Sequence, residues 1–276
     1  MRVHPLLSYP LSIMLGTSVY ASSYGLSISA DTTQFDYAET DMQGRLADTE
    51  RSEFGDISGF TFSLEPDYQG FYITTSYSNG NTDYIGGVTI KNPDGSYTTT
   101  PYGSFLTTTE NTLLNYSAGF KTTTLLDRYG EIKMPFKIGL GYREWERDIH
   151  GKYDDALGLY VSGVNEIYDW GYLDIGIGLH FALSPDATLG IDASYQTAFN
   201  AQMRENIYGN TFDLNNVHGY KITVPFEIVV NQSLSAFVQY NYEYWNIGAS
   251  NVIDRQYEPD SETKNQTLSA GLKFWF

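Results

Sequence analysis

The 276-residue chain contains no cysteine, and only 18% of its residues are charged. The lack of cysteine excludes a disulfide framework, a thiolate nucleophile and a cysteine-bound metal. Lysine and arginine number 16 against 33 aspartates and glutamates, so the formal net charge is −17, which argues against a nucleic-acid partner. No spacing of acidic residues matches a calcium-binding loop, and we expect neither a cofactor nor a bound metal.

Long apolar runs are also missing beyond the first residues of the chain. No later stretch approaches the roughly 20 consecutive apolar residues of a membrane-spanning helix, which excludes a helical membrane protein. The N-terminus has one basic residue, Arg2, a mostly apolar or small stretch from Leu6 to Val19, and small residues at Val19 and Ala21. This pattern predicts a signal peptide over residues 1–21 and a mature chain that begins at Ser22. A retained N-terminal anchor is the alternative.

Tyrosine (24) and glycine (26) are abundant together with threonine, and this mixture favours strands and turns. The clearest strand pattern is the period-two alternation of the last ten residues, Thr267 to Phe276. One face has Leu268, Ala270, Leu272, Phe274 and Phe276, and the other has Thr267, Ser269, Gly271, Lys273 and Trp275. Only the first face suits lipid, as in a strand of a transmembrane barrel.

The same alternation recurs from Leu26 to the C-terminus, with short turns and long polar connections in turn. The short turns are at Pro66-Asp67, Asp127 to Gly130, Ser184 to Asp186 and Asn231-Gln232, and the long connections cover roughly residues 39–55, 80–109, 147–166, 202–216 and 248–264. We therefore predict an all-β fold over residues 22–276, an up-and-down antiparallel transmembrane β-barrel of about ten strands. Strand counts of eight or twelve, and a soluble sandwich or lipocalin-like barrel, are the alternatives.

The C-terminal strand also predicts where the protein is located. We interpret its lipid-facing residues Leu272, Phe274 and Phe276 as a membrane assembly signal. This interpretation implies the outer membrane of a Gram-negative cell, with both termini in the periplasm and the long loops outside. The expected partners are outer-membrane lipids with lipopolysaccharide, the barrel-assembly machinery and a ligand outside the cell.

The face opposite the lipid alternates basic and acidic residues. It has Lys121, Lys133, Lys137, Arg143, Lys221 and Lys273 together with Asp174, Asp192, Glu227 and Glu243. An unpaired buried charge is costly, so we predict ion pairs that cross-link the lumen. Because ten strands enclose little more space than eight, we expect a closed lumen. A narrow solute or ion channel is the alternative, in the room left by lumen glycines such as Gly139 and Gly141.

The mature chain has three histidines, which keeps the search for catalytic residues short. We expect His180 in the lumen, His218 at the outer rim, and His150 on the third long loop within Asp148-Ile149-His150. We assign a catalytic role to none of them, because each fits a solvated or hydrogen-bonded position.

The layout of ten strands with five long outer loops resembles the omptins, a family of outer-membrane proteases, and the ten-stranded Opc-type adhesins. The omptin resemblance implies an Asp-x-His on the fourth loop and an Asp pair on the second, which together activate a water. Here Asn216 precedes His218 where the family has aspartate, and Asp83 is followed by Tyr84 and Ile85. Asp148-x-His150 has the right spacing but lies on the third loop.

We therefore expect a non-enzymatic role in surface structure, recognition or adhesion, exerted through the extracellular loops. The alternatives are the narrow channel and an omptin-like rim hydrolase, for which His218, Asp83, Asp148 and His150 are weak candidates.

Overall fold

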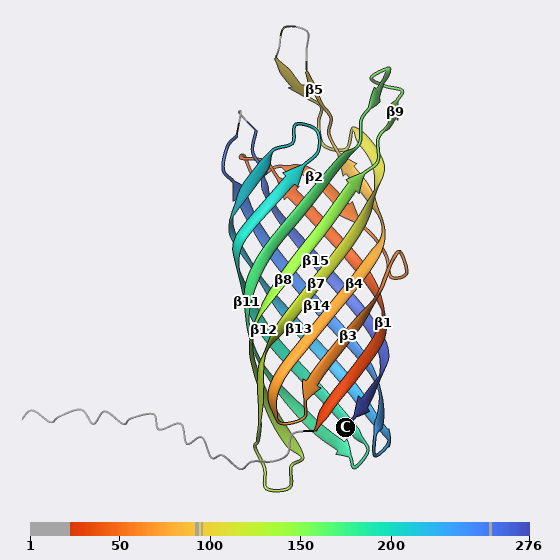
Figure 1. Cartoon of the computed structure of the whole chain (residues 1–276). Helices are drawn as coiled ribbons and strands as arrows, with labels where there is room; N and C mark the ends of the chain where they lie inside the picture. Colours follow the sequence, from red (N-terminus) through yellow and green to blue (C-terminus); the bar gives the residue numbers. More distant parts are fainter. Residues whose placement is uncertain (1–22, 92–93, 95, 254–255) are drawn as a thin grey trace, which may run out of the picture.

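A computed structural model describes residues 23–91, 94, 96–253 and 256–276 (Figure 1). The predicted signal peptide, residues 1–21, lies outside the described residues. No helix in the described part of the chain is long and apolar enough to cross a membrane.

The described residues form an antiparallel β-barrel. Its strands are β1 (Tyr24–Thr40), β2 (Leu46–Arg51), β3 (Ile57–Pro66), β4 (Gln69–Gly86), β7 (Phe105–Leu125), β8 (Ile132–Ile149), β11 (Val164–Ser184), β12 (Ala187–Glu205), β13 (Thr211–Asn231), β14 (Leu234–Ser250) and β15 (Asp260–Trp275). Both β2 and β3 lie between β1 and β4, so these eleven strands make a ring of ten positions. The predicted ten-stranded up-and-down barrel is confirmed.

The ring closes where the last strand pairs with the first. The register runs from Gly25 opposite Trp275 to Thr40 opposite Asp260. Tyr24 and Phe276 exchange two backbone hydrogen bonds of 3.0 Å, which fixes the C-terminus at the closing seam. The side chains of Phe274 and Phe276 are 47% and 74% exposed on the outside, and Leu272 faces outward beside them. The role of these side chains in assembly stays a prediction.

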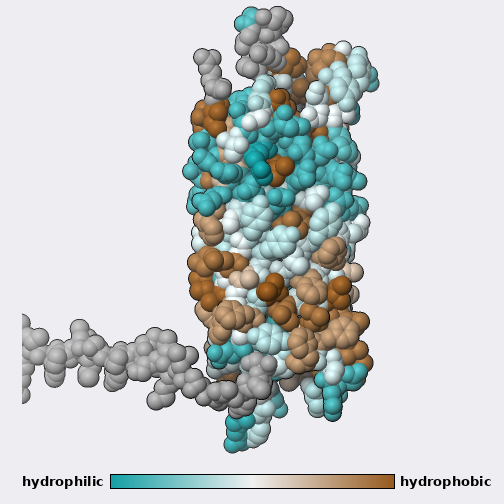
Figure 2. All heavy atoms as spheres, in the orientation of Figure 1, coloured by the Kyte–Doolittle hydropathy of each residue, from teal (hydrophilic) through white to brown (hydrophobic). Residues whose placement is uncertain are grey.

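An apolar belt surrounds the half of the barrel nearest the termini, and Figure 2 shows it on one face. Large apolar side chains face outward there, for example Phe136, Ile138 and Leu140 of β8. Such a continuous band suits lipid, so this half spans the membrane. A strand needs about 9–11 residues to cross a bilayer, whereas β7, β11 and β13 each have 21. The strands therefore extend well beyond the belt at the end that bears the long connections, here called the loop end.

Beyond the belt the arrangement of the strands is reversed, so that polar side chains face outward and apolar ones face the interior. On β8, Glu144 and Glu146 face outward while Trp145 and Arg147 are fully buried inside. The reason is that apolar side chains gain nothing outside once water replaces lipid, so they turn to the interior. The interior residues form one core: Phe35, Tyr37, Ile57, Leu113, Trp145, Tyr168, Trp170, Tyr172, Ala201, Met203, Phe212, Leu214, Val217, Trp245 and Ile247.

The connections at the loop end are shorter than predicted. They cover residues 41–45, 52–56, 87–104, 150–163, 206–210 and 251–259, and the predicted long loops were wrong at their edges. Outward polar residues gave those edges a loop-like composition, but inward partners such as Met203 and Phe212 continue the strands. The second and third connections form hairpins from β5 (Thr89–Lys91) with β6 (Tyr97–Thr99) and from β9 (Lys152–Asp154) with β10 (Leu159–Val161). All four short turns lie where the sequence predicts them.

Gly139 and Gly141 of β8 make room for two tyrosine rings inside the barrel. A Cβ at Gly141 would lie 2.1 Å from Cζ of Tyr172, and one at Gly139 would lie 2.3 Å from the hydroxyl of Tyr72. The space that these glycines were expected to leave for a narrow channel is therefore filled by tyrosine.

Gly141→Ala should destabilise the barrel, because the new methyl group displaces Tyr172 from its edge contact with Trp245, at 5.6 Å between ring centroids. Overpacking of this kind costs about 1–3 kcal/mol. Urea unfolding of the refolded protein in detergent, followed by tryptophan fluorescence, measures the loss. Gly176→Ala is the control, since its Cβ comes no closer than 3.1 Å to any neighbour. Equal losses from the two substitutions would contradict the packing described for Tyr172.

Candidate functional site at the loop end

Asp83 and His218, two of the weak candidates for a rim hydrolase, lie far apart in the structure. Asp83 of β4 is exposed between the inward-facing Thr82 and Tyr84. His218 of β13 is also on the outside, where its ring lies 6.3 Å from that of Tyr195. Since β4 and β13 hold the third and eighth of the ten positions, the two side chains point away from opposite sides of the barrel. They therefore cannot act on the same bond of a substrate.

Asp148 and His150 lie on the outer surface where β8 ends. Asp148 is exposed and stands opposite Glu110 of β7. The Nδ1 atom of His150 is 3.0 Å from the hydroxyl of Thr108, and Asp148 is not its hydrogen-bond partner. The remaining histidine, His180, faces the lumen as expected, with Nε2 at 3.0 Å from an oxygen of Asp192.

The most concentrated group of ionisable residues lies inside the loop end, around Arg147. We call it the Arg147 cluster, and it consists of Tyr37, Glu39, Asp48, Glu50, Arg147, Glu166, Tyr168 and Glu258. Arg147 is fully buried and donates from Nη2 to Glu50 at 2.7 Å and from Nη1 to Glu166 at 2.7 Å. Its guanidinium also lies 4.1 Å from the centre of the Tyr37 ring. One cation therefore joins β1, β2, β8 and β11.

Glu50 extends this network to the neighbouring strands. Its second oxygen accepts hydrogen bonds from the hydroxyl of Thr82 at 2.8 Å and from the side-chain amide of Asn111 at 2.9 Å. Asn111 in turn accepts a hydrogen bond of 2.7 Å from the indole of Trp145. Every one of these groups is buried, so their polar atoms are satisfied within the protein rather than by solvent.

The other side of the cluster fixes the connection between β14 and β15. Tyr168 donates a hydrogen bond to Glu258 of that connection, and its oxygen lies 3.3 Å from a carboxylate oxygen of Glu166. Tyr37 donates to Glu39 at 2.9 Å. The loop of residues 251–259 is thus attached to the wall of the barrel through a buried carboxyl group.

The Arg147 cluster has five carboxyl groups against one guanidinium. Burial raises the pKa of Glu258 to about 8, and repulsion from Glu166 adds to the effect. Burial and repulsion from Glu258 likewise raise the pKa of Glu39 to about 8. The pKa of Asp48 is also raised by burial, and Oδ1 of this residue has no hydrogen-bond partner among the described residues. Protonation of some of these carboxyl groups brings the cluster closer to neutrality.

Sequence reasoning missed the Arg147 cluster. Arg147 and Glu166 mark the two ends of the predicted 147–166 loop, and Glu39, Asp48 and Glu50 fall within the predicted 39–55 loop. The available signal was the alternation of Glu144, Trp145, Glu146 and Arg147, which places a tryptophan and an arginine on one face of a continued strand.

A layer of aromatic side chains lies next to the Arg147 cluster and fills the interior of the barrel at that level. Trp145 stacks on Tyr168 with ring centroids 4.8 Å apart, and Trp170 meets Trp245 edge-on at 5.0 Å. None of these four side chains is more than 1% exposed. The guanidinium of Arg143 lies 5.8 Å from the rings of both Trp170 and Trp245, on the side of the membrane-spanning half. This layer separates the lumen below it from the loop end.

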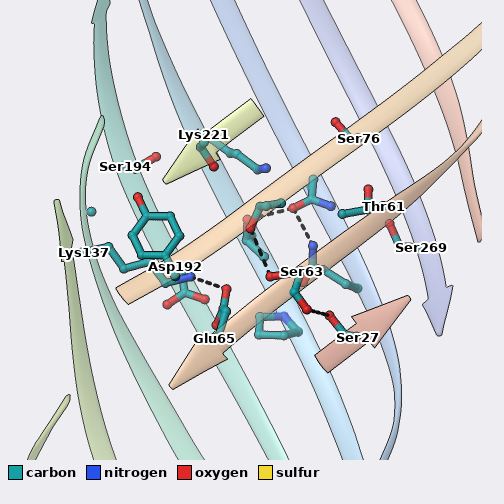
Figure 3. A pocket seen from close by; sticks show the side chains of 18 of the residues that line it. Ser27, Thr61, Ser63, Glu65, Ser76, Lys137, Asp192, Ser194, Lys221 and Ser269 are labelled. Carbon is teal, nitrogen blue, oxygen red and sulfur yellow. Dashed lines mark hydrogen bonds and ion pairs between the residues drawn. The ribbon is translucent and has the colours of Figure 1, made fainter. Parts of the chain in front are cut away.

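Ion pairs cross-link the lumen within the membrane-spanning half, as the sequence predicts for most of the charges (Figure 3). Glu65 bonds Lys121 at 3.1 Å and Lys137 at 2.9 Å. The other pairs are Lys133 with Asp67, Arg143 with Glu243, Lys273 with Glu227 and His180 with Asp192. Asp174 and Lys221, which were also expected to be paired, form no ion pair with any described residue.

The two hairpins at the loop end share a small apolar core. Its buried members are Tyr84, Val88, Phe105 and Ile149, with Ile90, Leu157, Val161 and Val164 packed against them. The core therefore holds β5 and β6 to β9 and β10. On the second hairpin Tyr153 and Tyr160 are directly opposite each other across the strands, and they are 57% and 64% exposed. An exposed tyrosine pair is thus displayed on a fixed support.

Comparison with solved structures identifies the architecture. The outer-membrane protease OmpT from Escherichia coli is 12% identical, with 93% of this chain and 97% of that chain covered and a TM-score of 0.59. The β domain of the Bordetella autotransporter BrkA (13% identity, 92% and 100% covered, TM-score 0.40) and OprG from Pseudomonas aeruginosa (10% identity, 93% and 96% covered, TM-score 0.35) also match. No protein-family model and no curated protein matches the sequence. The chain therefore has the fold of bacterial outer-membrane β-barrels, in a form similar to an omptin.

The raised pKa values of Glu39 and Glu258 predict that the barrel loses stability as pH rises. Between about pH 4.5 and pH 8 the folded protein keeps protons on these carboxyl groups that the unfolded chain has lost. Each such group lowers the free energy of unfolding by up to about 1.4 kcal/mol per pH unit in that window.

Urea unfolding in detergent at pH 5, 6, 7 and 8 measures this dependence. Glu258→Gln should have a shallower slope than the wild type, while Glu131→Gln, which changes an exposed carboxylate at the other end of the barrel, should keep the wild-type slope. Identical slopes for the wild type and Glu258→Gln would be inconsistent with a proton held at Glu258.

Proposed function

We propose that this chain is a surface recognition protein of the bacterial outer membrane, non-enzymatic and non-conducting, which binds its partner through the loop end. The short turns and both termini would then be periplasmic, with the loop end outside the cell. The alternation of short turns with longer connections supports this orientation, because it is the usual arrangement in outer-membrane barrels. The extension of the strands past the apolar belt raises the binding surface above the membrane.

The observation that carries the proposal is the fixed hairpin pair with its exposed tyrosines. Tyr153 and Tyr160 offer large amphipathic surfaces of the kind that is enriched in binding hot spots. Their support is held by a buried apolar core, so little conformational entropy is lost when a partner binds. A surface displayed in this way suits recognition better than a mobile loop does.

The charge of the loop end favours a partner with basic groups. Exposed acidic residues outnumber exposed basic ones there, and they include Glu53, Asp56, Asp83, Asp94, Asp155, Asp213 and Asp260 against Arg45, Arg51, Lys152 and Arg204. Complementary charge speeds association and excludes acidic competitors. The proposed partner is therefore a protein or glycan that presents cationic groups beside an apolar surface.

The aromatic layer supports the non-conducting part of the proposal. Because Trp145, Tyr168, Trp170 and Trp245 are at most 1% exposed, an ion crossing the barrel would have to displace tightly packed rings.

Binding of whole cells to arrays of immobilised proteins and glycans tests the recognition role. Gram-negative cells that produce the full chain should bind at least one cationic class of spot that cells without it do not bind. Tyr160→Ser should weaken that binding roughly 30-fold, as expected for a hot-spot aromatic worth about 2 kcal/mol. Tyr129→Ser is the matched control, since Tyr129 is a 70% exposed tyrosine at the opposite end of the barrel. Equal binding by cells with and without the chain, or equal loss in the two variants, would refute the role.

A further inference from the structure

The lumen of the membrane-spanning half contains a polar chamber with a volume of about 420 Å³ (Figure 3). Serine, threonine, asparagine and glutamine are 20 of its 45 lining residues, and they lie between the ion pairs described above. A volume of this size is in the range of small-molecule binding sites, roughly 300–1,000 Å³. Hydroxyl and amide groups on its wall provide hydrogen-bond partners for a polar solute.

The chamber has different surroundings at its two ends. A second hollow, of about 830 Å³, lies at the short-turn end and shares Asp67, Lys133, Thr188, Glu227 and Trp275 with the chamber wall. These shared residues show that the two spaces are adjacent. At the other end the chamber meets the aromatic layer, where Tyr172 lines it and packs against the fully buried Trp245. The short-turn end, where the adjacent hollow lies, is therefore the side from which a solute would reach the chamber.

Two charges on the chamber wall, Asp174 and Lys221, differ from the other wall charges because they have neither an ion pair nor a side-chain hydrogen bond with any described residue. Glu243 lies opposite Lys221 in the strand register, but its carboxylate accepts from Arg143 at 3.1 Å and from the indole of Trp245 at 2.6 Å. Lys221 is thus a second cation beside a carboxylate that is already bonded.

The two unpaired charges lie on β11 and β13, the two neighbours of β12, and a third unsatisfied group lies on β12 itself. Asp174 of β11 is directly opposite Gln196 of β12, and Lys221 of β13 is directly opposite Ser194 of β12. Gln196 is only 5% exposed, and neither its Oε1 nor Oδ1 of Asp174 has a hydrogen-bond partner among the described residues. Unsatisfied buried acceptors are rare and costly, and here they stand together near the end of the chamber that meets the aromatic layer.

We propose that this wall binds a small zwitterionic peptide, of the size of a dipeptide, that enters from the short-turn end. The ligand's ammonium group donates to the carboxylate of Asp174 and to Oε1 of Gln196. Its carboxylate accepts from the ammonium of Lys221 and from the hydroxyl of Ser194. Each charge of the ligand then meets the opposite charge on the protein, and the unsatisfied acceptors gain donors.

The spacing of the strands agrees with a dipeptide. Neighbouring strands are about 4.8 Å apart, and the partners Gln196 and Ser194 are two residues, about 7 Å, apart along β12, so the backbones at Asp174 and Lys221 are about 12 Å apart. An extended dipeptide of about 7 Å with a hydrogen bond of about 3 Å at each end covers about 13 Å, close to this separation. This site does not involve the loop end, so it is independent of the proposed recognition role.

Isothermal titration of the refolded mature chain in nanodiscs, with both ends of the barrel accessible, tests the proposal. Glycylglycine is the probe, and N-acetylglycinamide, which lacks both charges, is the comparison compound. Glycylglycine should bind saturably with one site per barrel, and N-acetylglycinamide should bind at least tenfold more weakly.

The variants Asp174→Asn and Lys221→Met should each weaken binding of glycylglycine at least tenfold. Asp174→Asn keeps the shape of the side chain, so it tests the charge even where Lys221→Met fails to refold. Ser117→Ala is the control, since Ser117 lines the chamber from β7 and takes no part in the proposed contacts. Absence of saturable binding by glycylglycine, equal binding by the uncharged compound, or unchanged affinity in Asp174→Asn would each overturn the proposal.

Discussion

The medium outside the barrel changes from hydrocarbon to water partway along every long strand, and the placement of side chains follows from that change. Within the lipid, apolar side chains face outward and polar ones line the lumen, so the interior is polar and cross-linked by ion pairs. Above the lipid, the same strands place their apolar residues inside, and the interior becomes a packed aromatic core. The barrel thus has a half with a polar lumen and a half with an aromatic core. The boundary between them is where Arg143 contacts Trp170 and Trp245.

The half with the aromatic core also contains a buried guanidinium, that of Arg147, and this charge determines how the surrounding side chains are arranged. A buried charge is tolerated only when it is paired and hydrogen-bonded, and removal of one partner typically costs about 3–5 kcal/mol. Glu50 and Glu166 meet that requirement from two different strands, and Tyr37 covers one face of the guanidinium. The surplus of carboxyl groups in the Arg147 cluster then makes the stability of the loop end depend on their protonation.

The membrane-spanning half could be predicted from the sequence in detail, whereas the loop end could not. The alternation that places Leu268, Ala270, Leu272 and Phe274 on one face indicates a strand with that face toward lipid. The short turns are marked by proline, aspartate and asparagine. The faces of Lys137, Glu243 and Lys273 follow from that pattern. At the loop end the pattern reverses, and outward residues such as Glu144 and Glu146 resemble a solvated loop. Three-dimensional contacts were needed to bring Glu50, Arg147, Glu166 and Glu258 together, because they are separated by long stretches of chain.

The separation of the lumen from the loop end by packed aromatic rings is the central claim, and single-channel recording in a planar bilayer tests it most directly. The refolded wild-type protein, shown to be folded by its altered mobility on an unheated gel, should insert without producing steps of conductance. A steady, ion-selective conductance from folded wild-type barrels would show a continuous water path past Trp145, Tyr168, Trp170 and Trp245, and would contradict the account.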